Sequence, residues 1–153
     1  MGLPVVVKKV YGSLGEGVYL ANSKEELYDI YAKSYRSPLL FEKYIKNSKG
    51  KSLRVLVINK RVIGIIERNG KDDFRSNFGN STYSKKVDNP TKYIEFAQKI
   101  ADILNIEYAG IDLLYDENNE PILCEINSNA FFEEFENVTK LNVAKAIAEM
   151  IIR

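Results

Sequence analysis

Two apolar segments on either side of a short polar turn constrain the fold of this 153-residue chain more than any other feature. Tyr108–Tyr115 and Pro121–Asn127 are predicted to pair as an antiparallel hairpin, because the intervening Asn118-Asn119 tolerates the positive φ angles of a tight turn. Alternation with a period of two places core-forming side chains on one face of the hairpin, namely Ile111, Leu113, Tyr115, Ile122, Cys124 and Ile126. This apolar face fixes the pairing register.

The opposite face of the same hairpin carries two acids and an amide. If the turn centres on the two asparagines, Asp112 lies directly across from Glu125 at a Cβ spacing of about 4.5–5.5 Å. Two carboxylates about 5 Å apart repel by roughly 3 kcal/mol at an effective dielectric constant of 20. A divalent cation would offset this repulsion, and Asn127 on the same face offers a third oxygen ligand. The alternative is a solvated polar face, although Leu114 and Leu123 indicate that this face is partly covered.

The composition limits the kind of metal and the kind of partner. The chain has no histidine and a single cysteine, so a histidine-ligated metal site and an internal disulfide are excluded. Oxygen ligands favour Mg²⁺, with Mn²⁺ or Ca²⁺ as alternatives. A balance of 22 basic and 21 acidic side chains predicts no nucleic-acid partner. No apolar run is long enough to span a bilayer and no signal peptide is recognisable, so we expect a cytoplasmic protein without a membrane partner.

A glycine-rich segment, Gly12–Gly17, lies between predicted strands at Pro4–Val10 and Val18–Leu20. Glycines there would let backbone N–H groups approach phosphates, and Lys8 on the incoming strand would place an ammonium group beside them. The segment is neither a P-loop nor a dinucleotide-binding motif, because it lacks Gly-Lys-Ser/Thr and a strand follows it. A protein-kinase flap is excluded because the lysine precedes the loop. A simple turn is the remaining alternative.

The remaining segments predict an α+β fold with mostly antiparallel strands. A Ser-x-x-Glu capping box predicts that Asn22 or Ser23 caps a first helix. Residues 69–89 are predicted to form a long mobile loop. Further predicted elements are a strand at Leu39–Glu42, a hairpin of Leu53–Ile58 with Arg61–Glu67, a helix capped by Asn89 and opened by Pro90, and a closing helix at Asn142–Ile152.

Together these motifs resemble the ATP-grasp enzymes, and most closely their RimK-like, glutamate ligase-type branch. The similarity covers nearly the whole chain and rests on motifs in the same order: Pro4-Val5-Val6-Val7-Lys8, Gly12–Gly17, Phe41-Glu42-Lys43-Tyr44-Ile45, Glu67-Arg68, Asp73-Phe74-Arg75-Ser76-Asn77, Gly110-Ile111-Asp112 and Glu125-Ile126-Asn127. The Asp-Phe-Arg-Ser-Asn string and the Asp-x12-Glu-x-Asn spacing are its most specific parts.

The resemblance implies two α+β lobes, residues 1–41 and 42–153, with ATP in the cleft between them. It implies that Lys8 contacts the α- and β-phosphates, and that a flap with Gly12, Ser13, Gly15 and Gly17 covers them. A hinge formed by Glu42, Lys43, Tyr44 and Ile45 would bind adenine through its backbone. Asp112, Glu125 and Asn127 would hold Mg²⁺ ions against the phosphates.

The activity that the resemblance implies is ATP-dependent ligation of a carboxylate to an amine through an acyl phosphate. Arg54, Arg75 and Asn77 would support phosphoryl transfer, which depends mainly on positioning and on neutralisation of charge. From the residues alone, Arg54 is equally an arginine that reaches solvent, and Arg75 is equally a loop arginine.

The sequence departs from the family at its start and on its acceptor side. The family's preceding substrate domain is absent, so we expect a piece of a longer protein, with the missing part supplied by a partner chain or by a homo-oligomer. Phe78-Gly79-Asn80 and Asn127-Ser128-Asn129 differ from the usual motifs, which leaves both substrates unassigned. Two alternatives to a ligase remain: a nucleotide-binding or interaction module without turnover, and a Ca²⁺-binding β domain that would not explain Lys8.

Overall fold

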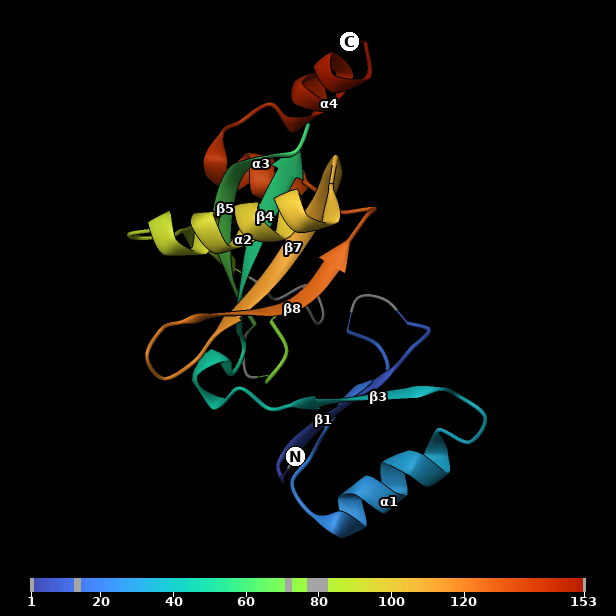
Figure 1. The fold of residues 1–153 in the computed structure, drawn as a ribbon. Helices are drawn as coiled ribbons and strands as arrows, with labels where there is room; N and C mark the ends of the chain where they lie inside the picture. Colours follow the sequence, from blue (N-terminus) through green and yellow to red (C-terminus); the bar gives the residue numbers. More distant parts are fainter. Residues whose placement is uncertain (1, 13–14, 71–72, 77–82, 153) are drawn as a thin grey trace.

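The structure is a computed structural model that describes residues 2–12, 15–70, 73–76 and 83–152 (Figure 1). Within these residues the strands form two antiparallel sheets, of three and five strands. The N-terminus lies at the end of the smaller sheet and the C-terminus at the far end of the larger one. The predicted α+β class with antiparallel strands is confirmed.

The smaller sheet has the order β2-β1-β3, with β1 at Val5–Lys9, β2 at Val18–Ala21 and β3 at Leu39–Lys43. Helix α1, Lys24–Lys33, covers one face of it. Apolar side chains from the strands and the helix form its core: Val5, Val7, Ala21, Leu27, Ile30 and Leu39. Because successive residues of a strand point to opposite faces, Lys8 lies on the face away from this core.

Local sequence accounts for the start of α1. Ser23 is the N-cap, and its hydroxyl oxygen accepts a hydrogen bond from the backbone N–H of Glu26 at 3.2 Å. The Glu26 carboxylate in turn accepts the backbone N–H of Asn22 at 2.7 Å. The predicted capping box is therefore confirmed with Ser23 as the cap, and the reciprocal bond goes to the residue before it.

The larger sheet has the order β6-β5-β4-β7-β8. Its strands are β4 at Lys51–Ile58, β5 at Arg61–Asn69, β6 at Tyr83–Lys86, β7 at Tyr108–Tyr115 and β8 at Pro121–Asn127. A short 3-10 helix, η1 at Lys46–Ser48, connects it to the smaller sheet. The lobe boundary predicted after residue 41 falls inside β3, and the division into lobes 1–41 and 42–153 stays a prediction.

Helices cover both faces of the larger sheet. Helix α2, Thr91–Leu104, crosses one face and packs Tyr93, Ala97 and Ala101 against the strands. Helices α3, Glu133–Thr139, and α4, Val143–Ile151, pack on a second apolar cluster that contains Leu56, Ile66 and Phe135. No helix in the described part of the chain has the length and apolarity needed to cross a membrane.

Two predictions about these elements need correction, and one helix was missed. The segment 69–89, predicted to be loop throughout, contains the edge strand β6, which pairs with β5. Helix α2 begins at Thr91 with Pro90 at the N-cap, whereas Asn89 has a φ of 50° and does not cap the helix. Helix α3 was not predicted at all. The closing helix is confirmed, and Asn142 caps it by accepting the backbone N–H of Lys145.

Candidate functional site

The β7–β8 hairpin has the predicted register over the acidic part of its polar face. Asp112 lies opposite Glu125 and Gly110 lies opposite Asn127, as a turn centred on the two asparagines requires. Beyond Asp112 the register shifts by one, so that Leu113 lies opposite Leu123 and Cys124 is the extra residue of a β-bulge. The two-residue turn is wrong, because residues 116–120 form the loop, closed by a hydrogen bond from the Asp116 N–H to the Glu120 carbonyl at 3.1 Å.

The carboxylate of Asp112 forms a bidentate ion pair with Arg54 of the neighbouring strand. Arg54 Nε lies 2.6 Å from Oδ1, and Arg54 Nη2 lies 2.8 Å from Oδ2. Both residues are only 6% exposed. Charge-assisted hydrogen bonds in this planar arrangement are among the stronger polar contacts in proteins. Arg54 is therefore a buried arginine, which corrects the alternative of a strand arginine that reaches solvent.

Because Gly110 has no side chain, the Arg54 guanidinium group can lie beside it. A Cβ atom on Gly110 would lie 2.4 Å from Arg54 Nη1 and 2.7 Å from the Cβ of Ala130. Any larger side chain would therefore have to displace the guanidinium group or the segment that carries Ala130. The Gly-Ile-Asp string of β7 thus supplies both the partner of Arg54 and the room for it.

A second arginine, Arg68 of β5, extends this network and was not among the predicted site residues. Its Nη1 lies 3.8 Å from Asp112 Oδ1, and its Nε donates to Glu134 of α3 at 2.9 Å. Burial and the neighbouring Arg54 lower the pKa of the Arg68 guanidinium, against the opposing effect of Asp112 and Glu134. The Ser84 hydroxyl on β6 also donates to Glu134. Only the pairing of distant strands brings these residues together, so no local sequence signal predicts the network.

The network changes the argument for a metal ion. Arg54 and Arg68 already compensate the charge of Asp112, so repulsion from Glu125 does not by itself require a cation. In the described part of the chain, no group of three or more acidic or cysteine side chains is close enough to hold a metal. The oxygen chemistry nevertheless fits Mg²⁺, because a carboxylate has about four lone-pair positions and the Asn127 side chain adds a carbonyl oxygen, which here accepts the Asn129 N–H at 2.9 Å.

The smaller sheet contributes Lys8, which reaches the β7–β8 hairpin of the larger sheet. Its ammonium Nζ lies 2.6 Å from Glu42 Oε2 and 3.7 Å from the Cys124 Sγ on the larger sheet. Burial favours loss of the Lys8 charge, but Cys124, Glu42 and Glu125 outweigh it and raise the pKa of Lys8. Lys8 therefore stays positively charged where the two sheets meet.

Cys124 lies on the side of the hairpin that faces Lys8, which corrects the prediction that it belongs to the apolar face. The bulge turns its side chain toward Lys8 and leaves Leu123 opposite Leu113. Burial raises the pKa of the Cys124 thiol to about 11, and Lys8 opposes that shift only in part. The thiol is thus protonated at neutral pH.

The segment predicted to be the adenine hinge runs from the end of β3 into η1. Glu42 and Lys43 are the last residues of β3, and Ile45 immediately precedes the 3-10 helix. Glu42 lies opposite Val6 of β1 and holds Lys8 through its carboxylate. The Tyr44 side chain is partly buried, and this burial raises the pKa of its hydroxyl. This segment is the only covalent connection between the two sheets, so the backbone there lines their junction.

The described part of the glycine-rich segment has the backbone that only glycine adopts easily. Gly15 and Gly17 have φ angles of 76° and 75°. A Cβ atom on Gly12 would lie 2.8 Å from the carbonyl oxygen of Glu16. The Gly17 carbonyl accepts the N–H of Lys9 at 2.9 Å, which anchors the segment to β1. Ser13, predicted to bind phosphate, lies outside the described residues.

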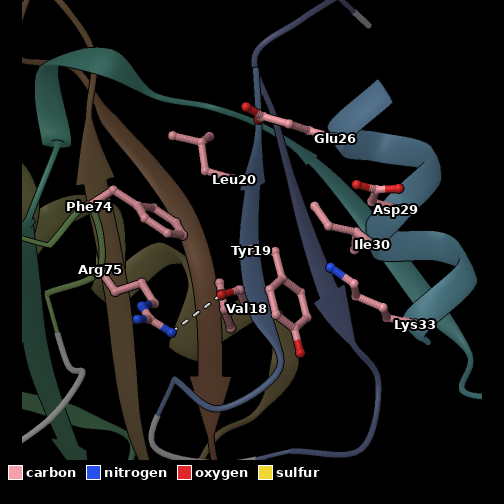
Figure 2. A pocket seen from close by; sticks show the side chains of 9 residues that line it. All are labelled: Val18, Tyr19, Leu20, Glu26, Asp29, Ile30, Lys33, Phe74 and Arg75. Atoms are coloured by element: carbon pink, nitrogen blue, oxygen red, sulfur yellow. Dashed lines mark hydrogen bonds between the residues drawn. The ribbon is translucent and has the colours of Figure 1, made fainter. Parts of the chain in front are cut away.

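Arg75 contacts this glycine segment from the larger sheet's side of the molecule. Its Nη1 donates to the carbonyl oxygens of Gly15 at 2.9 Å and Val18 at 3.3 Å, and Asp73 accepts from its other nitrogens. Arg75 also lines a groove of about 560 Å³ between β2, α1 and Phe74 (Figure 2). Asn77, predicted to lie beside Arg75, is outside the described residues.

The comparisons with known proteins indicate one family. The profile of the RimK-like ATP-grasp domain matches residues 1–151. Human N-acetylaspartylglutamate synthase A is 35% identical over 151 residues, which cover 97% of this chain and 39% of that protein. A probable alpha-L-glutamate ligase of Enterobacter is 33% identical over 156 residues, which cover 99% of this chain and 51% of the ligase. The chain thus spans about half or less of the length of these relatives.

Solved structures agree with the family profile. The ATP-grasp ligase PsnB, in complex with a minimal precursor, Mg and ADP, superposes with a TM-score of 0.73 at 19% identity. The match covers 97% of this chain and 45% of PsnB. At this level of identity the similarity concerns the fold, which agrees with the two antiparallel sheets and their helices.

Proposed function

The chain belongs to the RimK-like ATP-grasp family, and on that premise we propose that it is the ATP- and Mg²⁺-binding portion of an ATP-dependent carboxylate–amine ligase. The observation that carries this proposal is the contact between the Lys8 ammonium group of the smaller sheet and strand β8 of the larger sheet. Lys8 of β1 lies 3.7 Å from Cys124, which immediately precedes Glu125 and lies three residues before Asn127 in β8. This contact supports the proposal because it brings the proposed phosphate-binding cation close to the strand that carries two of the proposed metal ligands.

In this proposal the smaller sheet holds the nucleotide. Lys8 binds the α- and β-phosphates, with Glu42 fixing its position by an ion pair of 2.6 Å. Gly12, Gly15 and Gly17 allow the backbone to approach the phosphates, because no side chain stands in the way. The hinge from Glu42 to Ile45 binds adenine through backbone groups. Its location at the only covalent connection between the sheets supports this assignment.

The proposed metal ligands are Asp112, Glu125 and Asn127. Bound Mg²⁺, with Mn²⁺ as a substitute, would supply charge neutralisation at the phosphate oxygens. The residues of this chain orient those ligands. Arg54 fixes the Asp112 carboxylate by two hydrogen bonds, and the register places Glu125 and Asn127 on the same side of the hairpin.

The proposed reaction passes the γ-phosphoryl group of ATP to a substrate carboxylate, which leaves ADP and an acyl phosphate. An amine then attacks the acyl carbon and releases inorganic phosphate, so that an amide bond forms. No side chain here needs to act as a nucleophile, because the Cys124 thiol and the Lys8 amine both carry their protons at neutral pH. Both relatives have glutamate in their names, which makes glutamate the first amine to test.

Arg54 is the proposed cation beside the transferred phosphoryl group, where positioning and charge account for most of the catalysis. Asn77 is the proposed neighbour of that cation. Arg75 was expected to act as a second cation. Its bonds to Asp73 and to the glycine segment favour a different role, in which it holds that segment in place.

A thermal melt of the chain tests the proposal. The chain is heated with and without the ATP analogue AMPPNP, in Mg²⁺ and in EDTA. A ligand that binds only the native state at 100 times its dissociation constant adds about 2.7 kcal/mol of stability. We expect a rise in melting temperature that requires both the nucleotide and Mg²⁺. No rise at millimolar AMPPNP and Mg²⁺ would contradict the proposal and favour an interaction module without nucleotide binding.

A further inference from the structure

We propose that Arg75 is a positioning residue that fastens the end of the glycine segment across the nucleotide cleft, and that Asp73 sets its orientation. The fastened part, residues 15–18, is called the loop arm below. This inference rests on the proposed nucleotide-binding function. In this inference Arg75 binds the loop arm and does not bind the phosphates.

The guanidinium group of Arg75 is fully engaged in two directions. Toward the smaller sheet, Nη1 donates to the carbonyl oxygens of Gly15 and Val18. Toward its own loop, Nε lies 2.9 Å from Asp73 Oδ1 and Nη2 lies 2.8 Å from Oδ2. Figure 2 shows the Arg75 side chain directed to Val18, with α1 on the other side of β2. Through Nη1, Arg75 is thus connected to residues that are 57 and 60 positions away in sequence.

Asp73 fixes the orientation of the Arg75 side chain. Its Oδ1 also accepts the backbone N–H of Arg75 at 2.8 Å, so the carboxylate fixes both the backbone and the side chain. Hydrogen bonds from Arg75 lower the pKa of Asp73, which keeps the carboxylate ionised at neutral pH. A planar fork that binds a carboxylate on one side and two carbonyls on the other is specific to arginine, since a lysine ammonium has no such geometry.

Two glycines let the loop of Asp73 and Arg75 approach the start of β4. The Gly50 N–H donates to the Phe74 carbonyl at 2.8 Å, and the Gly70 N–H donates to the Gly50 carbonyl at 2.7 Å. A Cβ atom on Gly50 would lie 2.7 Å from the Asp73 carbonyl oxygen, and one on Gly70 would lie 2.2 Å from that of Arg75. The base of Arg75 is therefore fixed to the larger sheet.

The loop arm needs such support because β2 is an edge strand. Among the described strands β2 pairs with β1 alone, and the Gly17 carbonyl already binds Lys9 on that side. In an antiparallel pair, alternate residues direct their carbonyls away from the neighbouring strand. The Gly17 carbonyl faces β1, so the Val18 carbonyl points to the open side, and Arg75 donates both to it and to the carbonyl of Gly15 in the turn before β2.

The consequence is kinetic. A loop arm fastened on both sides must lose the Arg75 bonds before it can move away from a bound phosphate chain. Variants that weaken these bonds should therefore release nucleotide faster while the rate of association changes little. If Arg75 instead bound the phosphates directly, its removal would lower the affinity for nucleotide, whereas loss of its contact with Asp73 would have little effect.

The test is stopped-flow displacement of the fluorescent analogue mant-AMPPNP, with Mg²⁺, from the chain and from three variants. Arg75→Lys keeps the charge but loses the fork, and Asp73→Asn keeps the arginine but weakens its orientation. Lys33→Met is the matched control, because Lys33 lines the same groove from α1 and is exposed. We expect dissociation about tenfold faster for Arg75→Lys and Asp73→Asn, which corresponds to about 1.4 kcal/mol. Lys33→Met should behave like the unmodified chain, and the melting temperatures without nucleotide should agree.

Several outcomes would overturn the proposal. Dissociation rates for Arg75→Lys and Asp73→Asn equal to that of the unmodified chain would exclude fastening. A fourth variant, Arg75→Met, removes the charge: a loss of affinity in it, with an unchanged dissociation rate in Asp73→Asn, would assign Arg75 to the phosphates instead. An unmodified chain that binds no mant-AMPPNP would overturn the proposed function itself, and this inference with it.

Discussion

Arg54 and Asp112 face each other on the adjacent strands β4 and β7 and form two hydrogen bonds of 2.6 and 2.8 Å in a buried position. The carboxylate that we propose as a metal ligand is therefore also one half of a structural ion pair. Changes at Asp112 will affect folding and ligand binding together. The two effects have to be separated before either is attributed to the site.

Removal of one partner of the pair should destabilise the fold. Asp112→Ala leaves the Arg54 charge buried with only distant compensation, and breaking a buried ion pair in this way costs about 3–5 kcal/mol. The free energy of unfolding from urea titration measures the loss. The control is Glu120→Gln, which breaks the exposed pair with Lys92 and should cost at most about 1 kcal/mol. The double variant Arg54→Met/Asp112→Ala should lose less free energy of unfolding than the sum of the losses of the two single variants. A loss equal to that sum would mean that the two residues do not interact.

Glu125→Gln should weaken metal-dependent nucleotide binding and leave stability nearly unchanged. Glu125 is exposed, so its substitution removes a charge without breaking a buried pair. We expect the affinity for Mg²⁺-AMPPNP to fall at least about tenfold, or about 1.4 kcal/mol, in isothermal titration calorimetry. Glu117→Gln, in the exposed loop of the same hairpin, is the control. Equal affinities for the two variants would remove Glu125 from the metal site.

Gly110→Ala should displace Arg54. The added Cβ would lie 2.4 Å from Nη1 and 2.7 Å from the Ala130 Cβ, and overpacking of this kind costs about 1–3 kcal/mol. The free energy of unfolding measures the cost, and weaker binding of AMPPNP should accompany it. Gly2→Ala has no atom within 4 Å of the added Cβ and serves as the control. A Gly110→Ala variant as stable as the control would mean that Arg54 is seated more loosely than its contacts indicate.

Cys124 should be protected from alkylation by nucleotide. It is the chain's only cysteine, so iodoacetamide labelling detected by mass spectrometry reports on the cleft alone. The thiolate is the reactive form, and the pKa of about 11 means that the labelling rate should rise about tenfold with each pH unit up to that value. Mg²⁺-AMPPNP should slow the reaction at every pH. Labelling that levels off near pH 9, or that nucleotide does not affect, would contradict this placement.

The sequence predicted best those parts of the molecule that depend on neighbouring residues. The cap at Ser23 needs only Glu26, three positions away. The register that places Asp112 across from Glu125 needs only the two strands of one hairpin, because a slip by one residue would turn the apolar face outward. The resemblance to the ATP-grasp family added the order of motifs, and the family profile confirmed it.

The parts that were missed depend on pairing between distant segments. Arg54 and Asp112 are 58 residues apart, and only the adjacency of β4 and β7 makes them partners. The edge strand β6 is short and rich in charge, so its four residues carry no strand pattern without β5 beside them. The bulge at Cys124 follows two successive apolar residues, Ile122 and Leu123, and because either of them can face the core, alternation alone does not locate the bulge.

That bulge separates the two ends of the hairpin. On the side away from the loop, the register sets Glu125 opposite Asp112. On the loop side, the register is shifted by one residue and ends where the loop of residues 116–120 begins. The extra residue absorbs the mismatch between the two. Insertions or deletions in the loop can therefore be accommodated by adding or removing the bulge, without moving the acidic pair. The hairpin is free to vary in length during evolution at its outer end while its inner end stays constant.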